Sequence, residues 1–263
     1  MTRAQSPAYA AMLELLERRH GVGARGARWP AWMELRLERA LDALAESEGT
    51  DLEHAVERVR ADAGLLGEIA DLLRVGETSF YRDPPQWNAL RAYLPRFAGR
   101  ERVRALSAGC STGEEAWTLA MLLADARGAY RVVGVDRSGV ALATAREGLY
   151  PASCARSVPD ALAGRYLHVK SNSVRVADDL RQSVSFVPRD VMLGPPPGYY
   201  EVIVCKNVLI YFGDEAGEHA VQLLLRSLAD DGVLVVARSE VPRLRRMGHK
   251  AEELAQGVTV FRA

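Results

Sequence analysis

Cysteine and histidine are scarce in this 263-residue sequence, and neither follows a ligand pattern. The three cysteines, Cys110, Cys154 and Cys205, are odd in number, lie far apart and form no Cys-x-x-Cys pair. Such spacing argues against a disulfide framework and against a zinc site, so we expect reduced thiols. The five histidines form no His-Glu-x-x-His motif or other ligand spacing, and the sequence therefore predicts no metal site.

An excess of either charge is also lacking, because 34 basic residues balance 34 acidic ones and the formal net charge is +0. Nucleic-acid-binding proteins usually carry a positive field, so no nucleic-acid partner is predicted. No stretch approaches the ~18–20 apolar residues that a membrane span needs, and the first residues lack a secretory pattern. We expect a cytoplasmic protein without membrane insertion.

A loop of small residues joins an apolar strand to an amphipathic helix within residues 103–126. Gly109 and Gly113 permit positive φ, and the helix start presents free N–H groups to a ligand. Glu114 and Glu115 stand where a pyrophosphate would meet the positive end of the helix, and two carboxylates would repel it. They suit a cationic ligand, such as the ammonium and sulfonium of S-adenosylmethionine. The glycine spacing alone is a weak motif, because any tight connection can carry it.

The first 74 residues predict a small helical domain of about four helices. Apolar residues recur at helical spacing in four groups, at 9–16, 32–44, 52–59 and 65–73. Glycine, proline and capping residues separate the groups. The helices are rich in arginine with glutamates interleaved, which is consistent with a solvated face or with a docking surface for an acidic helical partner.

Residues 75–85 read as a structured linker that contributes to the cofactor site. They show no periodicity, hold Phe80 and Tyr81 among polar residues, and stop at a proline pair that disfavours helix in the preceding residue. A simple connector would seldom be so aromatic, so we expect this linker to fold back over the cofactor site.

From residue 86 to 263 strands and helices alternate, which is typical of an α/β domain with a largely parallel sheet. A helix at 86–97 precedes the first strand, and a second strand at 130–135 ends in Asp136. An acidic residue there, roughly 20 residues beyond the glycine loop, is where such folds hydrogen-bond ribose hydroxyls.

Shorter patterns predict the remaining elements. A helix at 140–147 precedes an irregular stretch at 148–164, which is too long for an ordinary turn. A small antiparallel insertion within about residues 150–188 is predicted from three alternating runs, at 165–169, 173–176 and 183–187. After it we expect a strand at 200–205, a helix at 215–228, a turn at 230–232, a strand at 233–237 and an edge strand at 258–262.

Five ordered blocks, which begin at Val75, Leu106, Ala145, Cys205 and Asp231, read VGETSFYRD, LSAGCSTGEE, AREGLY, CKNVLIYF and DGVLVVARSE. Together they resemble the successive signatures of the chemotaxis receptor glutamate methyltransferases, the CheR family. The resemblance covers residues 75–240 well and the helical domain weakly. It implies a Rossmann-like class I methyltransferase domain with a mainly parallel seven-stranded sheet and a small antiparallel β-insertion, preceded by a small all-α domain.

The resemblance also implies a site, in which Glu115 with Glu114 beside it takes the methionyl ammonium, Asp136 the ribose, and Asp190-Val191 the adenine region. Arg82 and Tyr211 would be catalytic, with Tyr211 facing the methyl group. The implied cofactor-binding residues are Gly76, Thr78, Arg82, Gly109, Glu114, Glu115, Asp136, Asp190, Val191, Lys206 and Asn207.

Four positions depart from the family pattern. Gly76 and Asp190 stand where many relatives have Asn, Lys206 replaces a usual Arg, and Arg238 replaces a common His. Asp190 and Lys206 keep hydrogen-bonding capacity, so we expect cofactor binding to survive, while Gly76 loses a side-chain contact.

The implied reaction forms glutamate methyl esters on a methyl-accepting chemoreceptor-type protein, with S-adenosylmethionine as donor and S-adenosylhomocysteine as product. A glutamate with a pKa near ~4.3 is already ionised at neutral pH, so no general base is needed. The alternatives are a related methyltransferase with another substrate and a non-catalytic cofactor-sensing domain. No segment predicts an oligomer, and we expect a monomer.

Overall fold

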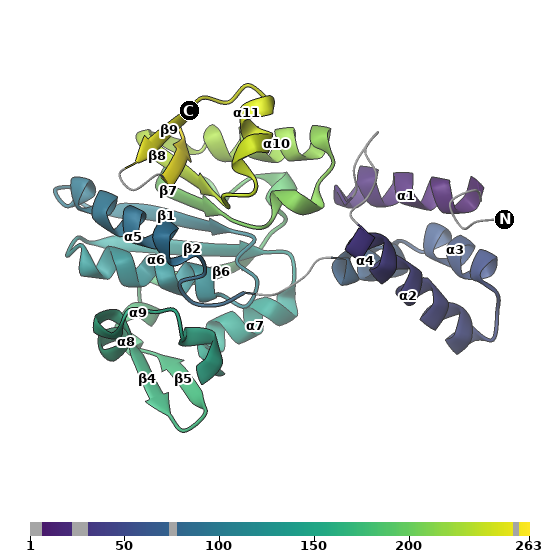
Figure 1. Ribbon diagram of the computed structural model, residues 1–263, viewed down its shortest axis with the longest axis horizontal. Coiled ribbons are helices and arrows are strands. Elements are labelled where there is room, and N and C mark those ends of the chain that lie inside the picture. Colours follow the sequence, from purple (N-terminus) through teal and green to yellow (C-terminus); the bar gives the residue numbers. More distant parts are fainter. Residues whose placement is uncertain (1–6, 23–30, 74–77, 255–257) are drawn as a thin grey trace. The chain divides into compact units, whose positions relative to one another are not determined.

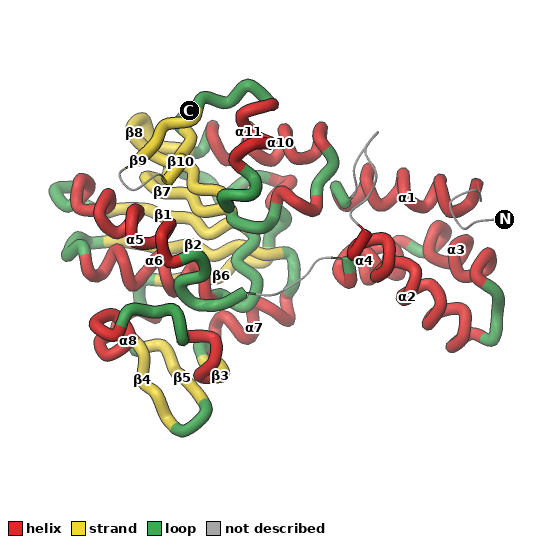
Figure 2. The backbone as a smooth tube through the Cα atoms, viewed as in Figure 1, coloured by secondary structure: helices red, strands yellow, loops and turns green. Residues whose placement is uncertain are grey.

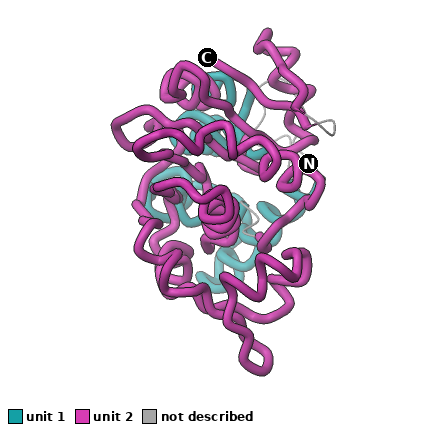
Figure 3. The backbone as a smooth tube through the Cα atoms, turned by 90° about the vertical axis from the view of Figure 1, so that its left-hand side faces the viewer, with its two compact units in different colours: residues 1–75, 210–219 teal, residues 76–209, 220–263 magenta. Residues whose placement is uncertain are grey.

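The computed structural model describes residues 7–22, 31–73, 78–254 and 258–263. The chain divides into two compact units, one of residues 1–75 with 210–219 and one of residues 76–209 with 220–263 (Figure 3). Residues 210–219 therefore belong to the first unit, although they are far from its other residues in sequence. The sequence patterns do not predict that these residues belong to the helical unit.

The first unit is helical, and its apolar positions fill one core in which Met12 and Leu37 are fully buried. Asp62 caps the fourth helix, because its carboxylate accepts the backbone N–H groups of Gly64 at 2.8 Å and Leu65 at 3.1 Å. The four predicted helices are confirmed as α1 (Pro7–His20), α2 (Ala31–Glu48), α3 (Leu52–Ala61) and α4 (Ala63–Leu72) (Figure 1).

The second unit is built on a seven-stranded sheet in the order β6-β2-β1-β7-β8-β10-β9. The first five strands in that order are parallel, whereas β10 is antiparallel to both of its neighbours. This sheet, yellow in Figure 2, confirms the predicted α/β fold. Its strands are β1 (Val103–Ala108), β2 (Tyr130–Asp136), β6 (Val184–Pro188), β7 (Tyr200–Cys205), β8 (Leu228–Val236), β9 (Ala251–Leu254) and β10 (Val258–Phe261).

Helices flank the sheet, and two of them follow the loops that matter for the site. The helix after β1, α6, packs against β1 and β2, and the helix after β2, α7, packs against β2 and β6. The helical elements of the second unit are α5 (Pro84–Tyr93), η2 (Leu94–Phe97), α6 (Glu114–Asp125), α7 (Gly139–Glu147), η4 (Val191–Leu193) and α11 (Val241–Arg246). The helices η5 (Leu209–Tyr211) and α10 (Asp214–Leu225) are divided between the two units.

The predicted antiparallel insertion exists, but one of its three strands was misassigned. The run at 183–187 is β6, which pairs in parallel with β2 at the edge of the main sheet. The third strand of the insertion is β3, inside the stretch predicted to be irregular. The insertion consists of β3 (Leu149–Pro151), η3 (Ala152–Ala155), α8 (Asp160–Tyr166), β4 (Leu167–Lys170), β5 (Ser173–Val176) and α9 (Asp178–Arg181).

Two predictions near the C-terminal end are also wrong. Strand β8 begins at Leu228, so residues 230–232 lie inside it instead of forming a turn, and a register shift between Tyr200 and Val202 of β7 accommodates them. Strand β10 lies between β8 and β9, so the edge of the sheet is β9. Within the described ranges, no helix combines the length and apolar character needed to cross a membrane.

Candidate functional site

The carboxyl-terminal ends of four neighbouring strands lie together along one edge of the main sheet. This carboxyl-terminal edge runs across the strands and is distinct from the outermost strands β6 and β9. Ala108 of β1 pairs with Val135 of β2, and Cys205 of β7 pairs with Val236 of β8. Open parallel sheets bind their ligands beyond this edge. The loops that extend from it are residues 109–113, 137–138, 206–208 and 237–240.

Two glycines of the loop after β1 are required by their surroundings. Gly109 has a φ of +75°, and a Cβ atom there would lie 2.5 Å from Cγ2 of Val208. Gly113 has a φ of +99°, and its Cβ would lie 2.7 Å from that of Ala145. Any side chain would therefore separate the loop after β1 from the loop after β7 and from α7. A direct contact of Gly109 with cofactor stays a prediction.

Glu114 and Glu115 begin α6, and both carboxyl groups are poorly solvated. Glu114 is 2% exposed and accepts the Thr112 hydroxyl at 2.7 Å, and burial raises its pKa. Glu115 accepts the Ser107 hydroxyl at 2.8 Å. The Glu115 residue is partly exposed, yet protein surrounds its carboxyl group, and burial raises its pKa to about 7 against the opposing charge of Lys206. A cationic ligand at this position would favour the ionised forms of both groups.

Asp136, at the end of β2, is held by backbone on both sides. One carboxylate oxygen accepts the N–H of Ser111 at 2.9 Å, and the other accepts the N–H of Ser138 at 2.9 Å. Each oxygen of a carboxylate has two lone pairs, so both oxygens can accept a further hydrogen bond. The carboxylate is therefore fixed between the glycine loop and the start of α7 while keeping acceptor capacity for a hydroxyl.

Lys206, directly after β7, is 8% exposed. Its ammonium donates to the Arg82 carbonyl at 2.7 Å and lies 4.8 Å from the centre of the Trp87 indole ring. Burial lowers the pKa of Lys206, whereas the negative charge of Glu115 raises it. The positive charge of Arg82 also favours the ionised form of Glu115. Lys206, Arg82 and Glu115 therefore form one coupled charge cluster.

The segment that carries Arg82 is anchored by its aromatic neighbours. Phe80 and Tyr81 are fully buried in the core of the second unit. The Phe80 N–H donates to the Cys154 carbonyl at 3.0 Å, and the Tyr81 N–H donates to the Thr118 hydroxyl at 3.0 Å. Arg82 itself is exposed, so a rigid backbone presents its guanidinium at the surface of the second unit.

Asp190 and Val191 follow β6, and the Arg189 N–H donates to the Asp136 carbonyl at 2.9 Å. Their segment therefore lies beside the end of β2. The Asp190 carboxylate accepts the Met192 N–H at 2.9 Å and lies 4.0 Å from an Arg137 guanidinium nitrogen. The Val191 side chain is buried.

Of the other predicted site residues, Asn207 lies at this edge, in the loop after β7. Gly76 lies outside the described residues, and Thr78 is half-buried. Tyr211 belongs to the first unit, where the residue is 7% exposed and its ring meets Trp32 edge-on with ring centres 5.9 Å apart. Asn207 follows Lys206 with a φ of +58°, which non-glycine residues rarely adopt.

Sequence reasoning missed Glu240 at this edge and gave no structural role to Arg238, which it identified as a departure from the family pattern. Glu240 is 1% exposed, and its carboxylate accepts the backbone N–H of Asn207. Arg238 pairs with Asp83, the residue after Arg82, through its Nε at 2.8 Å. Both side chains lie in the block that begins at Asp231, but a single acidic or basic residue after a strand carries no signal of its own.

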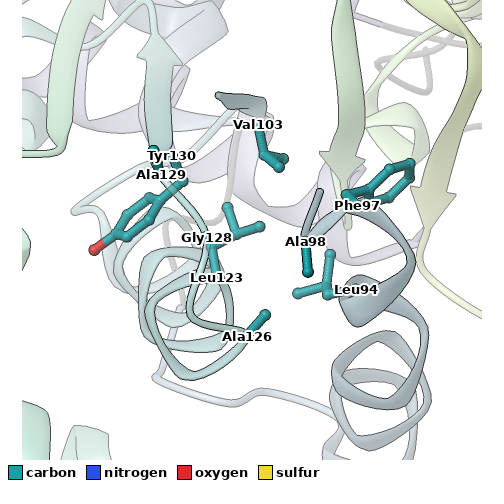
Figure 4. Close-up of a pocket in the computed structure, with 9 residues that line it drawn as sticks. All are labelled: Leu94, Phe97, Ala98, Val103, Leu123, Ala126, Gly128, Ala129 and Tyr130. Atoms are coloured by element: carbon teal, nitrogen blue, oxygen red, sulfur yellow. The ribbon is translucent and has the colours of Figure 1, made fainter. Parts of the chain in front are cut away.

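A small apolar cavity lies at the opposite, amino-terminal end of β1 and β2 (Figure 4). Its volume is about 10 Å³, which is at the lower limit for one water molecule. It therefore cannot hold a nucleotide-sized ligand. Its walls are Leu94, Phe97, Ala98, Val103, Leu123, Ala126, Gly128, Ala129 and Tyr130.

Comparison with known families matches residues 76–256 to the S-adenosylmethionine-binding domain of CheR methyltransferases. A probable biofilm formation methyltransferase of Pseudomonas putida is 32% identical over 86% of this chain and 56% of its own length. A chemotaxis protein methyltransferase of Listeria monocytogenes is 31% identical over 69% of this chain and 71% of its own length.

The chain spans about half of the Pseudomonas relative and 23% of an uncharacterized 104.1 kDa protein of Rhodobacter capsulatus, which is 27% identical over 80% of this chain. The cofactor of the matched domain is S-adenosylmethionine. The poorly solvated carboxyl groups at the start of α6 suit its sulfonium and ammonium groups, and the free acceptor capacity of Asp136 suits its ribose.

Proposed function

We propose, because this chain belongs to the CheR methyltransferase family, that it uses S-adenosylmethionine to form methyl esters on glutamate side chains of a chemoreceptor-type signalling protein. One observation carries the proposal. The Lys206 ammonium fixes the backbone of Arg82 beside the buried carboxyl group of Glu115. The Arg82 guanidinium, which suits an anionic methyl acceptor, is therefore next to carboxyl groups that suit a cationic methyl donor.

In this proposal each group at the edge has a role. Glu114 and Glu115 hold the methionyl ammonium, Asp136 accepts hydrogen bonds from the ribose hydroxyls, and the segment of Asp190 and Val191 lines the adenine region. Gly109 of the loop after β1 and Lys206 and Asn207 after β7 complete the surface that binds the cofactor. When bound, the cofactor supplies a methyl group on a sulfonium leaving group.

The residues of this chain would orient the acceptor and exclude water instead of moving a proton. A glutamate carboxylate with a pKa near ~4.3 arrives ionised. The Arg82 guanidinium would pair with one acceptor oxygen and leave lone pairs of the carboxylate for attack. Correct orientation of two reactants is worth up to roughly 7–11 kcal/mol, which is enough to accelerate attack by a weak nucleophile.

The identity of the acceptor is the finer part of the proposal. The relative from Listeria monocytogenes is named for chemotaxis and that from Pseudomonas putida for biofilm formation. We therefore propose a receptor with methyl-accepting glutamates as the substrate class, from a chemotaxis system or from a system for biofilm formation.

The test combines the protein with methyl-labelled S-adenosylmethionine and a purified cytoplasmic receptor fragment. Carboxyl methyl esters are base-labile, so label released as volatile methanol at high pH would support the proposal. The control is the same fragment with its candidate glutamates changed to glutamine, which cannot be esterified. If the protein binds the cofactor but leaves no base-labile label on receptor fragments of either proposed kind, chemotaxis or biofilm formation, the result would point to another acceptor or to a sensing role.

A further inference from the structure

Glu240 is a buried carboxylate that three backbone N–H groups share. One oxygen accepts the N–H of Asn207 at 3.1 Å and that of Ala237 at 2.9 Å. The other accepts the N–H of Leu209 at 2.9 Å. The side chain therefore joins the ends of β7 and β8 at the edge where the cofactor is proposed to bind.

The contacts of Glu240 select one conformation of residues 207–209. Asn207 has a φ of +58°, in the left-handed region that costs most residues with a side chain about 1–2 kcal/mol and asparagine less. Two N–H groups that converge on one charged acceptor offset this cost, because charge-assisted hydrogen bonds are the strong ones. Without the carboxylate, both N–H groups would be left without this acceptor and the strained conformation would lose its support.

Arg243, one helical turn further on, holds the same segment from the other side. Its guanidinium donates to the Leu209 carbonyl, and its backbone N–H donates to the Glu240 carbonyl at 3.0 Å. Both polar groups of the Leu209 backbone are thus bound by side chains at the start of α11. Glu240 also contributes to the charge cluster, since its negative charge favours the protonated forms of Glu115 and Lys206.

We propose that Glu240 is a positioning residue for methyl transfer. It fixes the backbone of residues 207–209, which lie in the sequence between Lys206 and Tyr211. This inference rests on the proposed function. It assigns no contact between Glu240 and the cofactor or the acceptor.

The decisive variant is Glu240→Gln, which keeps the size of the side chain. The carbonyl oxygen of the glutamine can still accept the N–H groups of Asn207 and Ala237, whereas its NH2 group cannot accept the N–H of Leu209. We expect kcat to fall about tenfold or more, with the KM for S-adenosylmethionine and the Kd for S-adenosylhomocysteine within about threefold. Arg243→Met, which releases the Leu209 carbonyl, should give the same separation of kcat from KM.

Glu201→Gln is the matched control. Glu201 is also a buried carboxylate that accepts a backbone N–H, from Arg104 at 2.7 Å, but it lies near the amino-terminal end of β7. We expect this variant to lower the urea midpoint and to keep kcat within about twofold. If Glu240→Gln and Glu201→Gln lower stability equally and both keep kcat, Glu240 is merely structural and the inference is wrong.

Hydrogen exchange separates this inference from the proposed function. In Glu240→Gln with S-adenosylhomocysteine bound, the Leu209 amide should exchange at least about tenfold faster than in the wild type, while Asn207 changes little. Unchanged exchange at Leu209 would overturn the inference even if the wild type methylates receptors. Wild-type protein that binds cofactor but esterifies no receptor would overturn the proposed function, and the exchange pattern would still decide the role of Glu240.

Discussion

Replacing Glu115 with glutamine should stabilise the cofactor-free protein and weaken its hold on the cofactor. Glu115 has a carboxyl group whose pKa burial raises from 4.5 to about 7. Its native environment thus favours the protonated form, so the stability that this group contributes is complete below pH 4.5 and is lost as the pH rises to about 7. A glutamine keeps the hydrogen bond from Ser107 and has no charge to desolvate.

The size of the effect follows from the difference between the folded and unfolded pKa values. Linkage makes Glu115→Gln more stable than the wild type by about 2 kcal/mol at pH 6 and about 3 kcal/mol at pH 8. The gain should therefore grow by about 1 kcal/mol over these two pH units. The same substitution removes a carboxylate from the proposed ammonium site, and we expect S-adenosylhomocysteine to bind at least tenfold more weakly at pH 8.

Urea unfolding of the cofactor-free protein at pH 6 and pH 8 measures the first effect, and titration calorimetry with S-adenosylhomocysteine measures the second. Glu101→Gln, at an exposed carboxylate ahead of β1, serves as the control and should change neither quantity. A Glu115→Gln protein that unfolds at lower urea than the wild type at pH 8 would refute the desolvation reasoning. Unchanged affinity would refute the assignment of Glu115 to the ammonium.

Three further substitutions test other parts of the site. Arg82→Ala should lower kcat for receptor methylation at saturating cofactor about 100-fold, and Arg82→Lys should be intermediate because lysine lacks the bidentate fork. Equal rates for the wild type and Arg82→Ala would show that the assignment of Arg82 is wrong. Asp136→Asn should weaken S-adenosylhomocysteine binding by about tenfold or more in calorimetry and lower stability by about 1–3 kcal/mol, since one N–H from Ser111 or Ser138 then faces an amide. Gly109→Ala should cost about 1–3 kcal/mol in urea unfolding, and adding Val208→Ala should recover part of that loss if the clash is its cause.

Local chemistry made much of this molecule predictable from its sequence. Apolar spacing located the helices of the first unit, and the small residues of the loop after β1 predicted a close approach of backbone. The structure gives that loop a specific reason, since a side chain at Gly109 would meet Val208. Two acidic residues at a helix start predicted a cationic ligand, and the roles of Glu114 and Glu115 stay predictions, with the pKa of both carboxyl groups raised by burial.

Strand partners and long-range contacts were not predictable in the same way. Alternation at 183–187 identifies a strand but not its neighbours, and pairing with β2 instead of the insertion is decided by tertiary packing. Two of the three N–H groups that donate to the buried Glu240 carboxylate, those of Asn207 and Leu209, are 33 and 31 residues away, so no local pattern predicts this acceptor. The grouping of residues 210–219 with the helical unit likewise depends on contacts distant in sequence.

The two departures from the family pattern at Lys206 and Arg238 act on the same short segment. Tyr81 and Asp83 both have positive φ, at 58° and 67°, so the backbone on either side of Arg82 is strained and needs support. The Lys206 ammonium binds the Arg82 carbonyl and Arg238 binds the Asp83 carboxylate. A single donor suffices for a carbonyl, and a guanidinium suits a carboxylate. Lys206 and Arg238 therefore hold Arg82 and Asp83 in place, and the proposed orientation of an anionic acceptor requires that placement.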